Sequence, residues 1–321
     1  MKEQIYVAGH TGMVGSAVCR ALLANGSGPR IVTSDHAKVD LRDAKATENF
    51  FQKHAITQVY VCAAQVGGIL ANNSRPYDFI FNNLSIQLNV MQAALENGVK
   101  KLLFLGSSCI YPKKCPQPMK EKHLLSGYLE ATNEPYAIAK IAGIKLCESI
   151  NRQFHDGGFD FRALMPTNLY GPGDNYHPTE SHVIAALIRK FILAKKNALP
   201  VVSVWGSGSQ LREFMHVDDV AAAALHVMNM KFEKFKTYAP ANQCFLNAGS
   251  GHEIEIAALA HLIAEISGFK GEIEFDKSKM EGVKKKLLDS SAIKASGWSP
   301  SITLVQGLKK ACSEYEKSCS E

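Results

Sequence analysis

The sequence has no apolar run long enough to cross a bilayer. A transmembrane helix needs about 20 mostly apolar residues, and a signal peptide joins a charged region to an apolar one. The chain of 321 residues contains neither pattern, and its first residues lead directly into a predicted strand. We therefore expect no membrane partner and a cytoplasmic protein.

The sequence also lacks a cysteine framework. Its 8 cysteines form no C-x-x-C pair, which is the spacing that zinc sites and redox motifs favour. Free thiols persist where the compartment is reducing. We expect reduced cysteines and no metal.

A strong charge bias is missing as well. The net charge is +6, and apart from lysine pairs the like charges gather only at 284–286. Nucleic-acid binding needs a larger basic patch, so we expect no nucleic acid. An anionic substrate or cofactor accounts for the mild excess equally well. Hydrophobic residues make up 46% of the chain, which is enough to bury a large core.

The chain does contain alternating strands and helices. A strand over 4–8 is followed by a glycine pattern at 9–15 and a helix to about residue 25. Glycines at this point permit a tight turn and let a pyrophosphate approach the helix N-terminus. We predict an α/β fold with a Rossmann-type doubly wound parallel sheet. The expected domains are 1–170, with 215–248 contributing, and a smaller interleaved α/β substrate lobe over 171–321.

A second predicted strand, over 30–33, ends where the adenosine ribose of a dinucleotide would lie. An acidic residue there favours a free 2′-hydroxyl, and basic residues favour a 2′-phosphate. The sequence has Asp35 beside His36 and Lys38, so the choice stays open. Asp40 is placed to border the adenine, and Asp43 is predicted to cap the next helix.

Tyr136 and Lys140 lie four residues apart on a predicted helix, and so on one face. An ammonium near a phenol lowers the pKa of the phenol, which suits a proton donor for carbonyl reduction. Ser107 and Ser108 follow a buried strand over 102–106. Either serine is placed to hydrogen-bond a substrate carbonyl, and the sequence does not choose between them. An ordinary helix surface and a strand-capping turn are the plain alternatives.

The same helix, predicted to end near Phe154, is apolar over much of its girth. Ile138, Ile141, Ile144 and Leu146 add apolar surface to the Tyr136 face. Such a helix can pack against a second copy of itself. We expect a homodimer on this basis.

Long motifs carry a resemblance to a known family. They read GHTGMVG at 9–15, AAQVGGILANN at 63–73, LLFLGSSCIYP at 102–112, TNEPYAIAKIAGIKLCE at 132–148, MPTNLYGP at 165–172, SHVI at 181–184 and WGSGSQLREFMHVDD at 205–219. The chain resembles the extended short-chain dehydrogenase/reductases, and more narrowly the family of GDP-L-fucose synthases. The likeness covers nearly the whole chain.

This resemblance implies a reaction in two stages on a GDP-sugar, GDP-4-keto-6-deoxy-D-mannose. Cys109 and His182 match the family's acid–base pair for epimerisation at C3 and C5. Tyr136, Lys140 and Ser107 match the residues that serve reduction at C4 by NADP(H).

The resemblance also implies a set of binding residues. Those for the cofactor are Gly9, Thr11, Gly12, Met13, Val14, Gly15, His36, Asp40, Leu41, Ala63, Ala64, Lys140, Pro166, Asn168, Leu169 and His182. Those for the substrate are Ser108, Asn168, Lys190, Trp205 and Arg212.

Two departures from the family pattern matter. Some bacterial members have an arginine at the position of Thr11 and arginines near Ser34 and His36. Their absence leaves the choice between NADPH and NADH open. A Pro-Asp-Gly segment of the family is replaced by residues 280–282.

Three rival functions remain from the sequence. One is a related 4-keto reductase/epimerase, such as a GDP-L-colitose synthase, with the same catalytic residues. Another is a plain nucleotide-sugar 4-reductase, which would not need both Cys109 and His182. The third is a non-catalytic dinucleotide sensor, which would not need Ser107, Tyr136 and Lys140 together.

Overall fold

A six-stranded parallel sheet organises the molecule. The computed structural model describes residues 4–25, 30–240, 242–279 and 282–319. The strands of the sheet, in spatial order, are β2 (Arg30–Val32), β1 (Gln4–Ala8), β3 (Gln58–Val61), β4 (Lys101–Leu105), β5 (Asp160–Pro166) and β9 (Phe245–Ala248). Every neighbouring pair is parallel, so all the carboxyl ends meet at one edge, where α/β proteins bind ligands.

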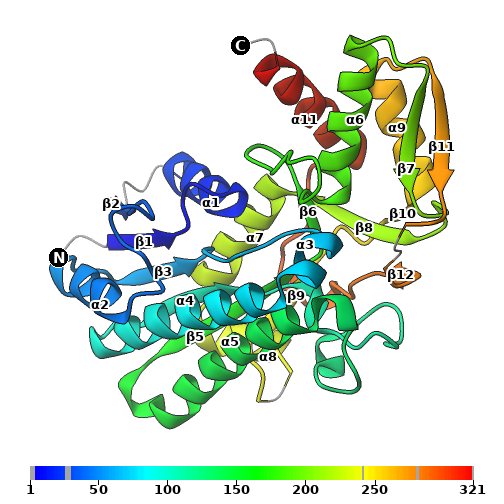
Figure 1. Ribbon diagram of the computed structural model, residues 1–321. Helices are drawn as coiled ribbons and strands as arrows, with labels where there is room; N and C mark the ends of the chain where they lie inside the picture. The colour runs from blue at the N-terminus through cyan, green and yellow to red at the C-terminus, as the bar shows by residue number, and fades with distance from the viewer. Residues whose placement is uncertain (1–3, 26–29, 241, 280–281, 320–321) are drawn as a thin grey trace.

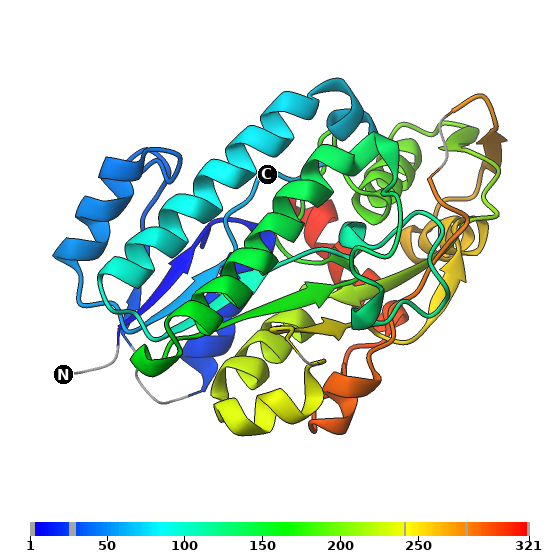
Figure 2. The same ribbon diagram turned by 90° about the horizontal axis from the view of Figure 1, so that it is seen from below.

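Helices cover both faces of this sheet (Figures 1 and 2). One face carries α1 (Met13–Ala24) and α7 (Val217–Asn229), and the other carries α2 (Ala44–Lys53), α4 (Pro76–Glu96) and α5 (Glu134–Gln153). Successive strand residues point to opposite faces: Ile5 and Val7 pack in one core, and Tyr6 and Ala8 in the other. A sheet buried on both faces reads as continuous apolar runs, which is why these strands were recognisable.

A second lobe lies beyond the carboxyl edge and has its own core (Figure 1). Its helices are α6 (Val183–Lys196), α9 (Ile256–Ser267) and α11 (Leu304–Ser318). β7 (Val201–Trp205) pairs with β11 (Glu272–Asp276). A second small sheet contains β6 (Asn168–Tyr170), β8 (Leu211–His216), β10 (Glu253–Glu255) and β12 (Lys285–Lys286).

The predicted fold class is confirmed, including the interleaving. The chain leaves the large sheet after β5 and returns to it at β9, and α7 packs against α1 between these visits. β6 joins the small sheet three residues before the predicted start of the substrate lobe at 171. The domain boundaries themselves stay a prediction.

The strand β8 was not predicted from the sequence, because its polar side chains find their partners only in the folded interior. Its sequence reads as a loop before a helix, yet the Glu213 side chain is 0% exposed. The carboxylate accepts N–H groups from Gly251 at 2.7 Å and Leu288 at 3.0 Å, and buried polar groups need such partners. The short segments α3 (Ile69–Ser74), α8 (Phe232–Tyr238) and α10 (Ser291–Ala295) were also not predicted. Among the described helices, none is long and apolar enough to span a membrane.

Candidate active site

The glycines of the turn between β1 and α1 have two different roles. Some are needed for the fold, and one leaves room for a ligand. Gly9 has φ +82°, and a Cβ on Gly15 would lie 2.1 Å from the Gly9 carbonyl oxygen. Both positions therefore require glycine for the fold. A Cβ on Gly12 would touch, among the described residues, only that same oxygen at an ordinary 3.5 Å. Gly12 is exposed at the N-cap of α1, with no side-chain cap, and free amides at a helix N-terminus attract phosphate. The turn fits a dinucleotide pyrophosphate.

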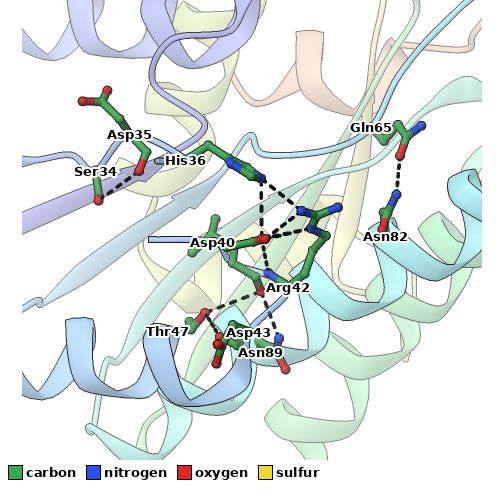
Figure 3. A network of polar contacts seen from close by, with 11 residues as sticks. Ser34, Asp35, His36, Asp40, Arg42, Asp43, Thr47, Gln65, Asn82 and Asn89 are labelled. Carbon is green, nitrogen blue, oxygen red and sulfur yellow. Dashed lines mark hydrogen bonds and ion pairs between the residues drawn. The ribbon is translucent and has the colours of Figure 1, made fainter. Parts of the chain in front are cut away.

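A network of charged side chains follows β2, at the predicted adenosine end (Figure 3). Arg42 donates to Asp40 through Nε at 3.0 Å and Nη2 at 2.7 Å, and this bonding lowers the pKa of Asp40 to about 2. His36 Nε2 lies 3.5 Å from Arg42 Nη2. Asp35 is engaged by His10 at 3.4 Å and by Lys38 at 3.5 Å. The carboxylate expected to favour a 2′-hydroxyl is thus already partnered, and Arg42 adds a cation that sequence reasoning missed.

The loop into α2 is fixed by local hydrogen bonds. Asp43 accepts the Ala46 N–H at 2.9 Å, so its predicted capping role is confirmed. The Leu41 carbonyl accepts from Asn89 of α4 at 2.9 Å (Figure 3). These bonds hold Asp40 and Leu41 beside the end of β2.

Four of the predicted catalytic residues come together where β4 ends. Ser107 precedes a short 3-10 turn, Ser108–Ile110, and its hydroxyl accepts the Cys109 N–H at 3.3 Å. Ser107 also hydrogen-bonds Tyr136 of α5. Ser108 is 4% exposed, and Ser107 is the serine that interacts with the phenol. The Lys140 ammonium donates to the Leu105 carbonyl at 2.8 Å, and burial lowers the pKa of Lys140 to about 8.

The expected effect of Lys140 on Tyr136 is not seen. Burial raises the pKa of Tyr136, Cys109 acts in the same direction, and the hydrogen bond from Ser107 opposes them. Lys140 Nζ lies 5.8 Å from the Tyr136 ring centroid, and its ammonium is directed at the Leu105 carbonyl. The phenol therefore stays protonated near neutral pH, which still suits a proton donor.

Cys109 has two donors that the sequence did not point out. Asn133 Nδ2 lies 3.3 Å and Lys286 Nζ 3.4 Å from its sulfur. Arg212 of β8 also interacts electrostatically with Cys109. Asn133 stands three residues before Tyr136 in a quoted motif, which was an available signal. Lys286 belongs to the lysine run at 284–286, to which the sequence analysis assigned no role in the site.

His182 is the N-cap residue of α6. The residue as a whole is exposed, yet the surrounding protein lowers the pKa of the imidazole by desolvation. The glycine loop after β3 approaches the segment before His182, because Gly68 N–H donates to the Glu180 carbonyl at 3.0 Å. A Cβ on Gly68 would lie 2.9 Å from the Ser181 carbonyl oxygen. Packing between the lobes therefore explains this glycine without a ligand.

The remaining predicted residues form two groups. Lys190 donates to the Ser203 carbonyl at 2.7 Å and lies 5.5 Å from the ring of Trp205, which is 46% exposed. This pair belongs to the second lobe, and among the described residues no polar contact joins it directly to Cys109. Residues at the carboxyl ends of β3, β5 and the start of β6 form the other group: Ala63, Ala64, Pro166, Asn168 and Leu169. Residues 280 and 281 of the departing segment lie outside the described residues.

Comparison with known proteins agrees with this geometry. Residues 5–239 match the NAD dependent epimerase/dehydratase family. The chain is 51% identical to GDP-L-fucose synthase of Escherichia coli (strain K12), over 96% of this chain and 94% of that protein. It is 36% identical to GDP-L-colitose synthase of Yersinia pseudotuberculosis, over 97% of both chains.

A solved structure extends the likeness to three dimensions. The GDP-L-fucose synthetase from Naegleria fowleri bound to NADP superposes with a TM-score of 0.88 at 26% identity, covering 100% of this chain and 96% of that one. The chain belongs to the NAD dependent epimerase/dehydratase family, in its GDP-L-fucose synthase branch.

Proposed function

We propose that this protein converts GDP-4-keto-6-deoxy-D-mannose to GDP-L-fucose, by epimerisation at C3 and C5 and then NADPH-dependent reduction at C4. The observation that carries the proposal is the cluster at the end of β4, where Ser107 contacts both Tyr136 and the Cys109 backbone. A relative with 51% identity across 96% of the chain is a GDP-L-fucose synthase.

Epimerisation needs an acid and a base beside the sugar. Protons on the carbons next to a ketone are acidic because the electron pair left behind delocalises onto the ketone oxygen. One group takes the proton from C3 or C5, and another returns a proton to the opposite face. We assign these roles to Cys109 and His182. Because desolvation lowers the pKa of His182, its imidazole is neutral near pH 7 and can accept a proton. As the imidazolium that results, it can return a proton to the sugar.

Reduction needs a proton at the C4 oxygen and a fixed orientation of the ketone. NADPH, when bound, supplies the hydride to C4. Gly12 and the N-terminus of α1 would hold its pyrophosphate, and His36 and Arg42 lie where the adenosine end would be. Tyr136 donates the proton to the developing alkoxide, Ser107 hydrogen-bonds the same oxygen, and Lys140 sits behind the phenol as a cation.

A single NMR assay in deuterated water tests the function. Purified protein is incubated with NADPH and GDP-4-keto-6-deoxy-D-mannose. GDP-L-fucose with deuterium at C3 and C5, and protium at C4, is the expected product. A product reduced at C4 without deuterium at C3 and C5 would identify a plain 4-reductase. NADPH binding with no turnover of this sugar would contradict the proposal and favour another keto sugar, such as the colitose precursor, or a sensor.

Arg42 is expected to set the preference for NADPH over NADH. Its guanidinium is held by Asp40 beside His36, and a guanidinium binds a phosphate through paired donors. Replacing Arg42 by alanine should weaken NADPH binding by about tenfold, since one charge-assisted contact is worth roughly 1.5 kcal/mol. NADH binding should change little. Fluorescence titration of both cofactors measures this difference.

Lys45 provides the matched control for Arg42. It lies three residues further along, and its ammonium pairs with Glu48 at 2.9 Å on the exposed side of α2. The Lys45→Ala variant should bind both cofactors as the wild type does. An equal loss of NADPH and NADH affinity in Arg42→Ala would show that Arg42 supports the loop and does not read the phosphate.

Assembly and location follow as further parts of the proposal. The α4 helix exposes Tyr77, Phe81 and Leu88, and α5, which packs against α4, exposes Ile138. We propose a homodimer through this helix pair in the cytoplasm. Ile141 and Ile144, expected at the dimer face, are instead buried in the core. Light scattering that gives one 35.1 kDa chain per particle would contradict the dimer.

A further inference from the structure

We propose that Lys286 is a positioning residue for Cys109. The ammonium of Lys286 stabilises the thiolate form of the Cys109 sulfur during epimerisation. The inference rests on the proposed function for its catalytic meaning. Its physical content is a charged hydrogen bond between two lobes, from a strand of the small sheet to a turn of the large one, across 177 residues of sequence.

The surroundings of the Cys109 sulfur favour a negative charge. Lys286 Nζ at 3.4 Å and Asn133 Nδ2 at 3.3 Å both direct donors at it. An ammonium has three donors and no acceptor, so it cannot receive the hydrogen of a thiol. A thiolate accepts from both neighbours, and a nearby cation is the feature that activates cysteines in proteins.

A second cation shares the same face of the small sheet. β12 and β8 are parallel, and Lys286 is the register partner of Arg212. Partners on neighbouring strands point to the same side of a sheet, and Arg212 interacts electrostatically with Cys109. The titratable group facing the sulfur from α5 is the Tyr136 phenol, which is neutral near pH 7. Among the described residues, the two charged side chains that interact with Cys109 here, Lys286 and Arg212, are both positive.

Lys286 differs from the lysines beside it. Lys285 pairs with Glu253 at 2.8 Å, and the Lys284 side chain is exposed. Among the described residues, no carboxylate lies within ion-pair distance of Lys286. Its charge is thus not compensated by an acid, and the sulfur is the group that it contacts.

The backbone directly after Lys286 is anchored to two other parts of the chain. Leu288 N–H donates to Glu213 at 3.0 Å, which ties this segment to β8. Leu287 N–H donates to Gln117 at 2.9 Å, and Asp289 N–H donates to the Met119 carbonyl at 2.8 Å, which ties it to the loop after Cys109. The fold itself delivers the ammonium to the sulfur, so the contact does not depend on a bound sugar.

Alkylation of Cys109 by iodoacetamide tests the proposal without any sugar. Only the thiolate reacts, so the rate at a fixed neutral pH reports its population. Lys286→Met should slow alkylation of Cys109 by about tenfold, as expected for loss of one opposite charge at this distance. Peptide mass spectrometry follows Cys109, with Cys319 of the same digest as the internal reference. Lys285→Met is the matched control and should stay within about twofold of the wild type.

Proton exchange at C3 and C5 should fall about tenfold in Lys286→Met, in step with alkylation. Lys286→Arg, which keeps a cation, should restore most of both rates. Alkylation that is unchanged in Lys286→Met would overturn the proposal, because the lysine would then act only on the substrate. An arginine variant as slow as the methionine variant would overturn the charge argument.

The variants must remain folded for this comparison, and NADPH binding reports that. If Lys286→Met does not bind NADPH, Lys286→Gln replaces it under the same criteria. Because alkylation needs no sugar, its outcome is separate from the proposed function. If the wild type forms GDP-L-fucose but Lys286→Met is alkylated at an unchanged rate, only the Lys286 proposal is wrong. If Lys286→Met is alkylated more slowly but the wild type forms no GDP-L-fucose, only the proposed substrate is wrong.

Discussion

Replacing Tyr136 by phenylalanine is expected to slow reduction at C4 by about 10²–10⁴-fold, the range that a positioned general acid contributes. Exchange of the C3 and C5 protons with solvent should continue within a few-fold of the wild-type rate. The phenol hydrogen-bonds Ser107, and its removal leaves the ketone oxygen without its proton donor. Enolisation depends instead on the groups beside C3 and C5. Loss of NADPH fluorescence and NMR exchange measure the two stages separately.

Cys109→Ser is the converse variant. A serine hydroxyl is a much weaker acid than a thiol, so it cannot replace the thiol in proton exchange with C3 or C5. Exchange at C3 or C5 should fall by about 10²-fold or more, and GDP-L-fucose should not form. Tyr128→Phe is a control, since Tyr128 is 95% exposed and should behave as the wild type. If both site variants lose exchange to the same degree, the two-stage division of labour is wrong.

The local parts of this site were predictable because short-range rules decide them. β1 and the start of α1 follow from an apolar run and a glycine turn, and the structure places them at Gln4–Ala8 and Met13. The cap by Asp43 follows from residue type and position. Tyr136 and Lys140 were expected on one face of a helix because four residues make about one turn, and both lie in α5.

The long-range parts were not predictable from local patterns. The contact between Lys286 and Cys109 depends on how β12 pairs with β8, which in turn depends on the buried carboxylate of Glu213. A lysine run has no periodicity that separates Lys286 from its neighbours. The charged strand β8 fails the apolar test for a strand, because its polar groups find partners only after the lobes have assembled.

Burial explains why two expectations from the sequence were wrong, one about the pKa of Tyr136 and one about the packing of α5. The spacing of Tyr136 and Lys140 suggested a lowered pKa for the phenol, but desolvation raises it, because depth below the surface cannot be read from spacing. Ile141 and Ile144 looked available for a partner, but they pack in the core between α5 and the sheet. A helix that is apolar over most of its girth can be satisfied within one chain.

The two glycines at the start of α1 should separate folding from cofactor binding. In Gly15→Ala, the new Cβ would lie 2.1 Å from the Gly9 carbonyl oxygen and 2.9 Å from His10 Cα. Both are backbone atoms, so the turn itself must move, and overpacking of this kind costs about 3 kcal/mol. Denaturant unfolding without cofactor should show this loss of stability.

Gly12→Ala should give the opposite result. Gly12 has φ −78° and ψ 168°, a conformation that alanine adopts without strain, and its Cβ would make only an ordinary 3.5 Å contact. Stability should therefore change by less than about 1 kcal/mol. The methyl group would instead occupy the approach of the pyrophosphate to the N-terminus of α1, so NADPH affinity should fall by at least about tenfold, or roughly 1.4 kcal/mol. If Gly12→Ala bound NADPH normally, the pyrophosphate would not lie over this turn, and the assignment of the cofactor site to this turn would be wrong.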